Sequence, residues 1–173
     1  MSTDIGKVFE KELEKVFRSL KETHCLGWHK FPDSAAAGGA YINAQPSDNL
    51  MTLPPTCRLF DTPMFFLEAK ASETHKKLQM AMLRPSQRGA INFYSGLMRV
   101  PYLVFFWDVK GRRIEIWEGL TALSRQRSKM PVWVLSGVST GRKMNIPALT
   151  AQLAKQLRLP PIKETLELYG ETQ

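Results

Sequence analysis

The stretch FFLEAKAS, residues 65–72, places two charged side chains, Glu68 and Lys70, in a run that otherwise has the composition of a buried β-strand. Because side chains alternate across a strand, Glu68 and Lys70 share one face with Phe66, and Ala69 lies on the other face. A buried charge is costly unless it is paired or binds a metal. The stretch is therefore either a strand that ends in a structural ion pair or part of a functional site.

The segments around this stretch alternate between helical and strand patterns. Apolar residues recur at helical spacing from Asp4 to about Lys21, with Thr3 or Asp4 as the N-cap. Residues 27–56 have the pattern of brief strands joined by turns, and residues 57–71 that of a strand pair or one long bent strand. Further helices are expected over residues 86–98, 120–127 and 146–159, the first with Ser86 as N-cap, and further strands over residues 101–109, 113–119 and 131–137. This order predicts an α/β fold with a mixed central β-sheet flanked by helices.

Length and charge limit the classes of function. The 173 residues suit one domain, and 43% hydrophobic residues argue against disorder. The 24 Lys and Arg against 16 Asp and Glu give a net charge of +8, which favours a polyanionic partner, nucleic acid foremost.

Two further features bear on location. Cys25 and Cys57 are too few for a secreted disulfide framework and lack zinc-like spacing. The N-terminus has no apolar signal region, and there is no apolar run of the roughly 18 residues that a spanning helix needs. We therefore expect a cytoplasmic protein without membrane contact, in the host cytoplasm if the protein is viral.

A second acid is available to pair with Glu68. Asp48, in AQPSDNL (residues 44–50), precedes Glu68 in a turn-and-strand context. Two carboxylates on neighbouring strands supply the hard oxygen ligands that Mg²⁺ prefers, and Lys70 can orient a water and offset transition-state charge. Asp61 is a rival, but its place before Thr62-Pro63 is typical of a turn acid. Asp33 fits a loop cap as easily.

The order Asp48, then Glu68-Ala69-Lys70, resembles the signature of the PD-(D/E)xK nuclease superfamily. Within it, GKVFEKELEKVF (residues 6–17) resembles the opening helix of the archaeal-type Holliday junction resolvases, and the order QPSDNL, EAK, SQ resembles that of several phage resolvase-like nucleases. The likeness spans about residues 4–107. It implies a restriction-endonuclease-like core over residues 1–109, with residues 110–173 as a basic C-terminal extension of one nuclease domain. The gap between Asp48 and Glu68 and the length after Trp107 both exceed the pattern of the compact resolvases.

The resemblance also implies roles for individual residues. Glu10 matches the active-site glutamate of the opening helix. Ser34 matches the serine of an Arg/Lys-x-Pro-x-Ser loop near the scissile phosphate, and Gln87 matches a glutamine that steadies the lysine or a phosphate. The expected catalytic set is Glu10, Ser34, Asp48, Glu68, Lys70 and Gln87. Mg²⁺, which Mn²⁺ is expected to replace, would be held by Glu10, Asp48, Glu68 and the carbonyl of Ala69.

Two of these assignments have plain structural alternatives. Glu10 lies on the margin of the apolar face of the first helix, with Glu14 further out, and it could instead belong to a solvated face paired with Lys7 or Lys11. Gln87 could simply decorate the start of a helix. Both alternatives stay open at the level of sequence.

Basic residues are concentrated late in the chain, where residues 110–143 hold eight Lys and Arg against two Glu. Such a run is usually a solvated face, but in a nuclease-like chain it suggests a surface that follows DNA phosphates. No motif reads bases, so recognition of backbone and branch shape is expected. The expected DNA-binding residues are Lys30, Lys76, Lys77, Arg84, Arg88, Arg112, Arg113, Arg125, Arg127 and Lys129.

These features predict a Mg²⁺-dependent endodeoxyribonuclease that resolves four-way Holliday junctions by paired nicks, in DNA recombination and repair. Two equivalent scissile phosphates call for a two-fold symmetric homodimer. The first helix and the segments after Trp107 are candidates for its interface. Two alternatives remain: a phage or restriction-type nuclease that cuts duplex or DNA ends, and a non-catalytic DNA-binding protein with a nuclease-like fold.

Overall fold

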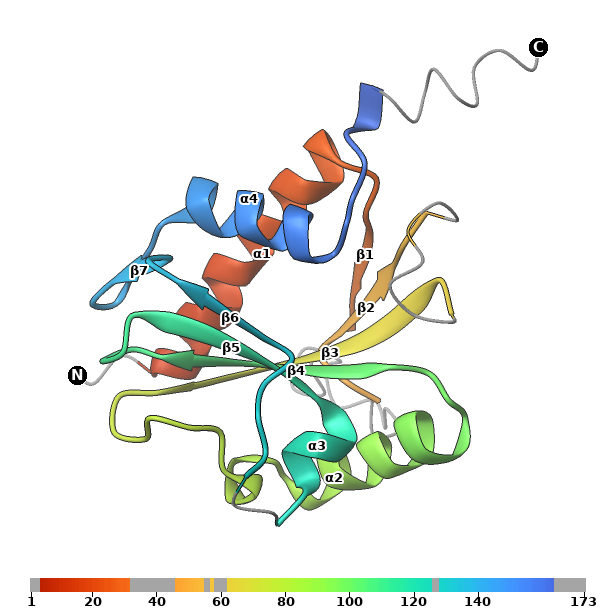
Figure 1. The fold of residues 1–173 in the computed structure, drawn as a ribbon, viewed down its shortest axis with the longest axis vertical. Helices are drawn as coiled ribbons and strands as arrows, with labels where there is room; N and C mark the ends of the chain where they lie inside the picture. The colour runs from red at the N-terminus through yellow and green to blue at the C-terminus, as the bar shows by residue number, and fades with distance from the viewer. Residues whose placement is uncertain (1–3, 32–45, 55–56, 58–61, 126–127, 164–173) are drawn as a thin grey trace, which may run out of the picture.

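A six-stranded mixed sheet forms the centre of the protein, with helices on both faces (Figure 1). The computed structural model describes residues 4–31, 46–54, 57, 62–125 and 128–163. Strand order follows chain order, β3 and β4 are parallel, and the other neighbouring pairs are antiparallel. The strands are β1 (Gly27–Lys30), β2 (Asn49–Thr52), β3 (Met64–Ser72), β4 (Tyr102–Asp108), β5 (Arg113–Glu118) and β6 (Trp133–Ser136). The expected α/β class, a mixed sheet flanked by helices, is confirmed.

The helices form two layers (Figure 1). The helices α1 (Ile5–Thr23) and α4 (Ile146–Gln156) cover one face of the sheet, beside the small hairpin β7 (Ser139–Thr140) and β8 (Lys143–Met144). The other face carries the short η2 (Met80–Met82), α2 (Pro85–Ile91), its π-helical continuation η3 (Asn92–Leu97), and α3 (Gly119–Leu123). Within the described ranges, no helix is both long and apolar enough to cross a membrane.

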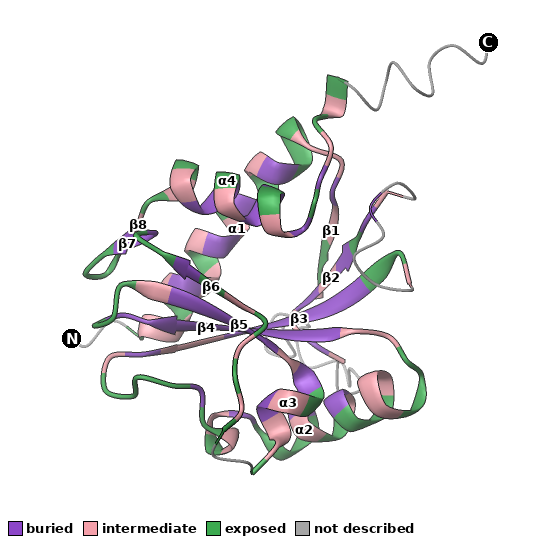
Figure 2. Cartoon of the chain, viewed as in Figure 1, coloured by how far each residue is buried: buried purple, intermediate pink, exposed green. Residues whose placement is uncertain are grey.

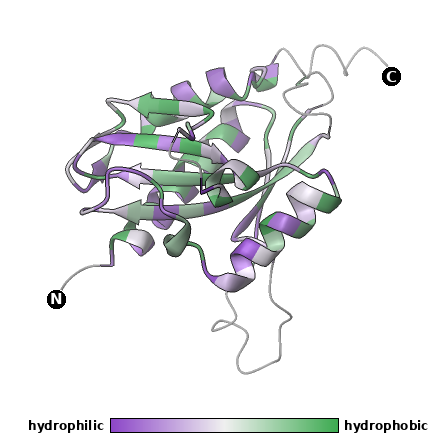
Figure 3. Ribbon diagram, turned by 60° about the horizontal axis from the view of Figure 1, so that its bottom comes forward, coloured by the Kyte–Doolittle hydropathy of each residue, from purple (hydrophilic) through white to green (hydrophobic). Residues whose placement is uncertain are grey.

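Strand β4 shows why its sequence is an unbroken apolar run. Every residue of β4 is buried, and the purple of buried residues dominates the central strands in Figure 2. Phe105 and Trp107 pack in the cluster beneath α1 and α4, whereas Val104 and Phe106 pack in the cluster beneath α2 and α3. In Figure 3 the green of hydrophobic residues covers much of the central strands. A strand covered on both faces needs no polar alternation.

The ends of the helices differ in part from expectation. The Asp4 carboxylate accepts a hydrogen bond from the Gly6 amide at 2.9 Å, so Asp4 is confirmed as the N-cap of α1. The prediction that Ser86 caps α2 is wrong: Arg84 is the N-cap, because Pro85 has no N–H and a preset φ that suit the first helical position. Glu118 ends β5 and caps α3 by accepting from the amides of Leu120 and Thr121.

Other boundaries are close to expectation. The hairpin between β4 and β5 is confirmed, and the Gly111 amide donates to Asp108 at 2.8 Å. The last helix ends earlier than expected, at Gln156, and Arg158 follows with a positive φ of 53°. The buried Cys57 thiol donates to the Leu157 carbonyl. Ser34, Asp33, Asp61 and Arg127 lie outside the described residues.

Candidate active site

The candidate site lies where the β2–β3 ladder ends. Asn49 pairs with Leu67 at the end of this antiparallel ladder, so Asp48 and Glu68 occupy the next position of the same register. The Asp48 carbonyl accepts a hydrogen bond from the Phe31 amide at 3.0 Å, which extends the β1–β2 pairing. Asp48 is thereby held opposite Glu68, although the two residues come from different strands.

The backbone of Ala69 faces the same opening. The Phe66 amide donates to Pro101 and the Ser72 carbonyl accepts from Val109, so the even-numbered residues of β3 direct their backbone groups toward β4. Backbone groups alternate along a strand, and Ala69 therefore directs its N–H and C=O toward the β2 side. In the described part of the chain, the pairing of β3 with β2 ends at Leu67, before Ala69. The Ala69 carbonyl is thus free of the ladder and faces the Asp48 side.

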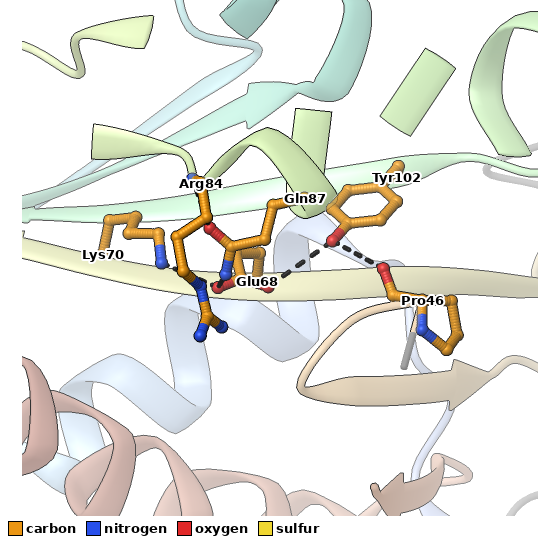
Figure 4. Close-up of polar contacts among 6 residues, drawn as sticks. All are labelled: Pro46, Glu68, Lys70, Arg84, Gln87 and Tyr102. Atoms are coloured by element: carbon orange, nitrogen blue, oxygen red, sulfur yellow. Dashed lines mark hydrogen bonds and ion pairs between the residues drawn. The ribbon is translucent and has the colours of Figure 1, made fainter. Parts of the chain in front are cut away.

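Glu68 is buried, with 1% of its side chain exposed, and three side chains bind its carboxylate (Figure 4). Lys70 Nζ lies 2.8 Å from Glu68 Oε1. The amide nitrogen of Gln87 donates to the same oxygen. The Tyr102 hydroxyl lies 3.4 Å from Oε2. The carboxylate is therefore fixed from β3, α2 and β4 at once.

The electrostatics of this carboxylate are unfavourable. Burial and the neighbouring Asp48 charge, opposed by Lys70, together raise the pKa of Glu68 to about 8. At neutral pH the pair therefore tends to hold a proton or a cation. Strongly shifted carboxylates of this kind are more common at functional sites than in ordinary ion pairs.

Glu10 lies on the α1 side of the same opening. Glu10, Asp48 and Ala69 line a small pocket between α1 and the β1–β3 edge of the sheet. Glu14 and Lys30 line it as well, and the Lys30 ammonium donates to the Glu14 carboxylate. That hydrogen bond raises the pKa of Lys30, with smaller contributions from the charges of Glu10 and Asp48. The structure thus places Glu10 in one pocket with Asp48 and Ala69, whereas the Glu68 carboxylate binds Gln87 and Tyr102.

Glu14 and the position of Lys30 were not anticipated. Helical spacing predicts Glu14 further from the apolar face than Glu10, yet Glu14 lines the pocket with Glu10, one turn away at i+4. The i, i+4 spacing of Glu10 and Glu14 could have predicted that both side chains lie on the same side of α1. Lys30, expected at a DNA surface, is half-exposed and paired with Glu14 inside the site.

Gln87 has an orientation that its neighbours dictate. The Arg84 amide can only donate, and it donates to Gln87 Oε1 at 2.9 Å. The NH₂ group of Gln87 is therefore left to face the Glu68 carboxylate. Gln87 therefore caps α2 with its amide oxygen and binds Glu68 with its NH₂ group. One side chain has both the structural role and the role in the site that the sequence left open. Burial raises the pKa of the Tyr102 hydroxyl, and the positive charge of exposed Arg84 partly offsets this rise.

The other expected DNA-binding residues fall into two groups. Lys76, Lys77, Arg112 and Arg125 are exposed, and Arg88 is half-exposed on α2. Two residues make contacts within the fold instead. Arg113 pairs with Glu115 at 3.0 Å and donates to the Lys76 carbonyl at 3.1 Å. Lys129 donates to the Ala122 carbonyl at 3.0 Å and lies 5.6 Å from the centre of the Trp117 ring.

The donor set is compatible with magnesium. In the described part of the chain, no group of three or more His, Cys, Asp or Glu side chains has the arrangement of a ready-made metal site. Mg²⁺ needs fewer protein ligands, because it keeps several waters and is commonly held by one or two carboxylates with substrate phosphate. Asp48 and Glu68, whose mutual repulsion a cation would relieve, meet that need.

No protein-family model matches the chain, and no curated protein was found to match it. The resemblance to the PD-(D/E)xK nucleases therefore rests on the sequence motif alone.

Proposed function

We propose that the protein is a Mg²⁺-dependent endodeoxyribonuclease with a restriction-endonuclease-like core, and that it resolves four-way DNA junctions. The observation that carries the proposal is the buried Glu68 carboxylate, held by Lys70 and Gln87 while a second acid, Asp48, raises its pKa. A purely structural Glu68–Lys70 pair has no need of a second carboxylate, which destabilises it. An arrangement that costs stability and gathers hard oxygen donors is best explained by metal-dependent chemistry.

Each residue has a role in this proposal. Asp48, Glu68 and the Ala69 carbonyl would hold Mg²⁺, with Glu10 completing the acidic site. Mg²⁺ bound there would polarise the scissile phosphate and make a bound water more acidic. The Lys70 ammonium would orient the attacking water and offset charge that develops on the phosphate oxygens. Gln87 would keep Glu68 in place during the reaction.

The substrate is argued from charge. Exposed cations lie both beside the site, at Arg84, and in the loop after β3, at Lys76 and Lys77. They suit contacts to DNA phosphates, which carry no sequence information. Binding that depends on backbone and branch shape fits a junction with two equivalent scissile phosphates. A symmetric homodimer would present one site to each of them.

The test is a cleavage assay of the purified chain with Mg²⁺ on an end-labelled four-way junction and on linear duplex of the same sequence. We expect symmetric nicks near the branch point, no cleavage in EDTA, and little cleavage of the duplex. Equal cleavage of both substrates would favour a general duplex nuclease. Tight junction binding with no cleavage under any divalent ion would favour the non-catalytic DNA-binding alternative.

A further inference from the structure

Tyr102 contacts both acidic segments of the candidate site. It is the first residue of β4 and is fully buried. Its hydroxyl donates to the Pro46 carbonyl at 3.0 Å and lies 3.4 Å from Glu68 Oε2 (Figure 4). Pro46 is two residues before Asp48. A single hydroxyl therefore links the segment that carries Asp48 to the carboxylate of Glu68.

This link matters because strand pairing brings the two acids to facing positions, but the ladder itself does not include them. The β2–β3 ladder ends at Asn49 and Leu67, one position short of the acids. The other contacts of the Asp48 segment run elsewhere: Ser47 Oγ donates to the Asn49 carbonyl at 2.7 Å, within the segment itself. The Phe31 amide bonds the Asp48 carbonyl toward β1. The hydrogen bond from the Tyr102 hydroxyl to the Pro46 carbonyl connects the Asp48 segment to β4.

The ring of Tyr102 is itself held firmly. It packs against the Phe66 ring, with centroids 6.0 Å apart. Gly119 lies against its backbone, where an added Cβ would come within 3.0 Å of the Tyr102 carbonyl oxygen and 3.2 Å of its Cβ. A hydroxyl on so constrained a ring can define a position in space for the groups that bind it.

We propose that Tyr102 is a positioning residue that sets the separation of Asp48 and Glu68 for binding of a divalent cation. This inference rests on the proposed function, because it assumes that these two acids hold the ion. Removal of groups that orient metal ligands typically lowers metal affinity about 10-fold to 100-fold. Tyr102 acts through a backbone carbonyl and one carboxylate oxygen, so we expect an effect near the lower end, about 10-fold.

The experiment compares Tyr102→Phe with Tyr94→Phe. Tyr94 is the matched control, because its ring packs on the same Phe66 at 4.5 Å between centroids, on the same face of the sheet. Binding of Mn²⁺ to the full chain is measured by calorimetry and by the electron paramagnetic resonance signal of free Mn²⁺, without DNA. We expect about 10-fold weaker Mn²⁺ binding for Tyr102→Phe, and unchanged Mn²⁺ binding for Tyr94→Phe. Junction binding in EDTA should match wild type for both variants.

Equal Mn²⁺ affinity of Tyr102→Phe and wild type would overturn the inference and leave Tyr102 as a core residue. A wild type that binds Mn²⁺ but cuts no DNA would overturn the proposed function, while the Mn²⁺ titration still decides the role of Tyr102. A wild type that binds no divalent ion would overturn both.

A second measurement keeps the inference testable if Tyr102→Phe does not fold. The chain has four tyrosines, so wild type labelled with 3-fluorotyrosine gives few fluorine resonances, and Tyr→Phe variants at the other positions assign the one from Tyr102. We expect this resonance to shift as Mg²⁺ saturates the site, with the Tyr94 resonance unmoved. An unmoved Tyr102 resonance at saturating Mg²⁺ would contradict the inference.

Discussion

Gln87 joins the first turn of α2 to Glu68, since its amide oxygen accepts from the Arg84 backbone while its NH₂ group donates to the buried carboxylate. The start of a helix and a charged group in the middle of the sheet thus depend on one side chain. Loss of either the amide oxygen or the NH₂ group of Gln87 should therefore destabilise the protein.

The first prediction concerns that residue. Gln87→Met keeps the size of the side chain but removes both hydrogen bonds, leaving a buried carboxylate without one of its donors. We expect a loss of about 1–3 kcal/mol in the free energy of unfolding, measured by urea denaturation, together with slower cleavage. Gln152→Met on α4 is the control, because Gln152 donates to the Ser136 carbonyl away from the acids. A loss no larger than that of the control would contradict the buried link.

The second prediction separates catalysis from stability. Asp48→Asn removes a negative charge that raises the pKa of Glu68. We expect cleavage to be abolished and junction binding in EDTA to be retained. The free energy of unfolding at pH 8 should rise by about 1 kcal/mol, since one pKa unit corresponds to about 1.4 kcal/mol. Asp61→Asn should keep activity. Cleavage by Asp48→Asn together with an inactive Asp61→Asn would show that Asp61 is the acid of the site.

The third prediction is a pH dependence of stability. The pKa of Glu68 is raised from 4.5 to about 8 in the folded protein, so the folded state holds the proton more tightly than the unfolded state. The stabilisation is complete below about pH 4.5 and is lost as the pH rises toward and through 8. In EDTA, wild type should lose stability relative to Glu68→Gln across this window, by up to about 5 kcal/mol. If the stability of wild type and of Glu68→Gln changed equally with pH, the raised pKa of Glu68 would be ruled out.

Mg²⁺ gives an internal check on this result. A cation that binds only the folded, ionised site should restore wild-type stability at pH 8.5 and leave Glu68→Gln nearly unchanged. NaCl at matched ionic strength serves as the control for general screening.

The fourth prediction concerns DNA affinity. Replacement of exposed Lys76, Lys77 and Arg112 by alanine should weaken junction binding and lower the salt slope by up to about three phosphate contacts. Lys155→Ala with Arg158→Ala, both exposed on and after α4, should leave the slope unchanged. Lys129→Ala should act mainly on stability, because Lys129 contacts Ala122 and Trp117. A salt slope that changes only with the α4 pair would place the DNA surface elsewhere.

The fifth prediction uses two glycines. A Cβ at Gly119 would lie 2.8 Å from Ile91 Cγ2 and 3.0 Å from the Tyr102 carbonyl oxygen, so Gly119→Ala should cost about 1–3 kcal/mol of stability. Nothing lies within 4 Å of the corresponding position at Gly89 on α2, so Gly89→Ala should be neutral or stabilising by up to about 1 kcal/mol. Thermal denaturation of both variants measures the difference. Equal effects would contradict the close packing of Gly119.

The sequence predicts those features that depend on local pattern. Helical periodicity and the Asp4 cap predict α1, and the alternation in β3 places Glu68 and Lys70 on one face. The approach of Asp48 to Glu68 follows once their strands pair as neighbours. These features require only strand periodicity, helix capping and the cost of burying charge.

The role of Tyr102 could not be predicted in this way. Within PYLVFFWDV it is typical of a core strand residue, and its ring is indeed buried. The hydroxyl meets Glu68 because β4 lies parallel to β3 with Tyr102 beside Phe66, a register that the connecting segment does not specify. The pairing of Lys30 with Glu14 likewise depends on how α1 crosses the sheet.

The parallel pairing of β3 and β4 has a kinetic consequence. Parallel neighbours cannot be joined by a tight turn, so residues 73–101 must cross the sheet before β4 can dock. Such non-local pairing forms slowly, because the chain loses conformational entropy before the stabilising contacts between the strands are made. Every acid of the candidate site precedes β4 in the chain, yet Glu68 remains at an open strand edge until β4 docks beside it. On the ribosome, synthesis of the acids therefore comes well before assembly of the site, and a nascent chain truncated before Tyr102 should carry all of its acids without binding the metal.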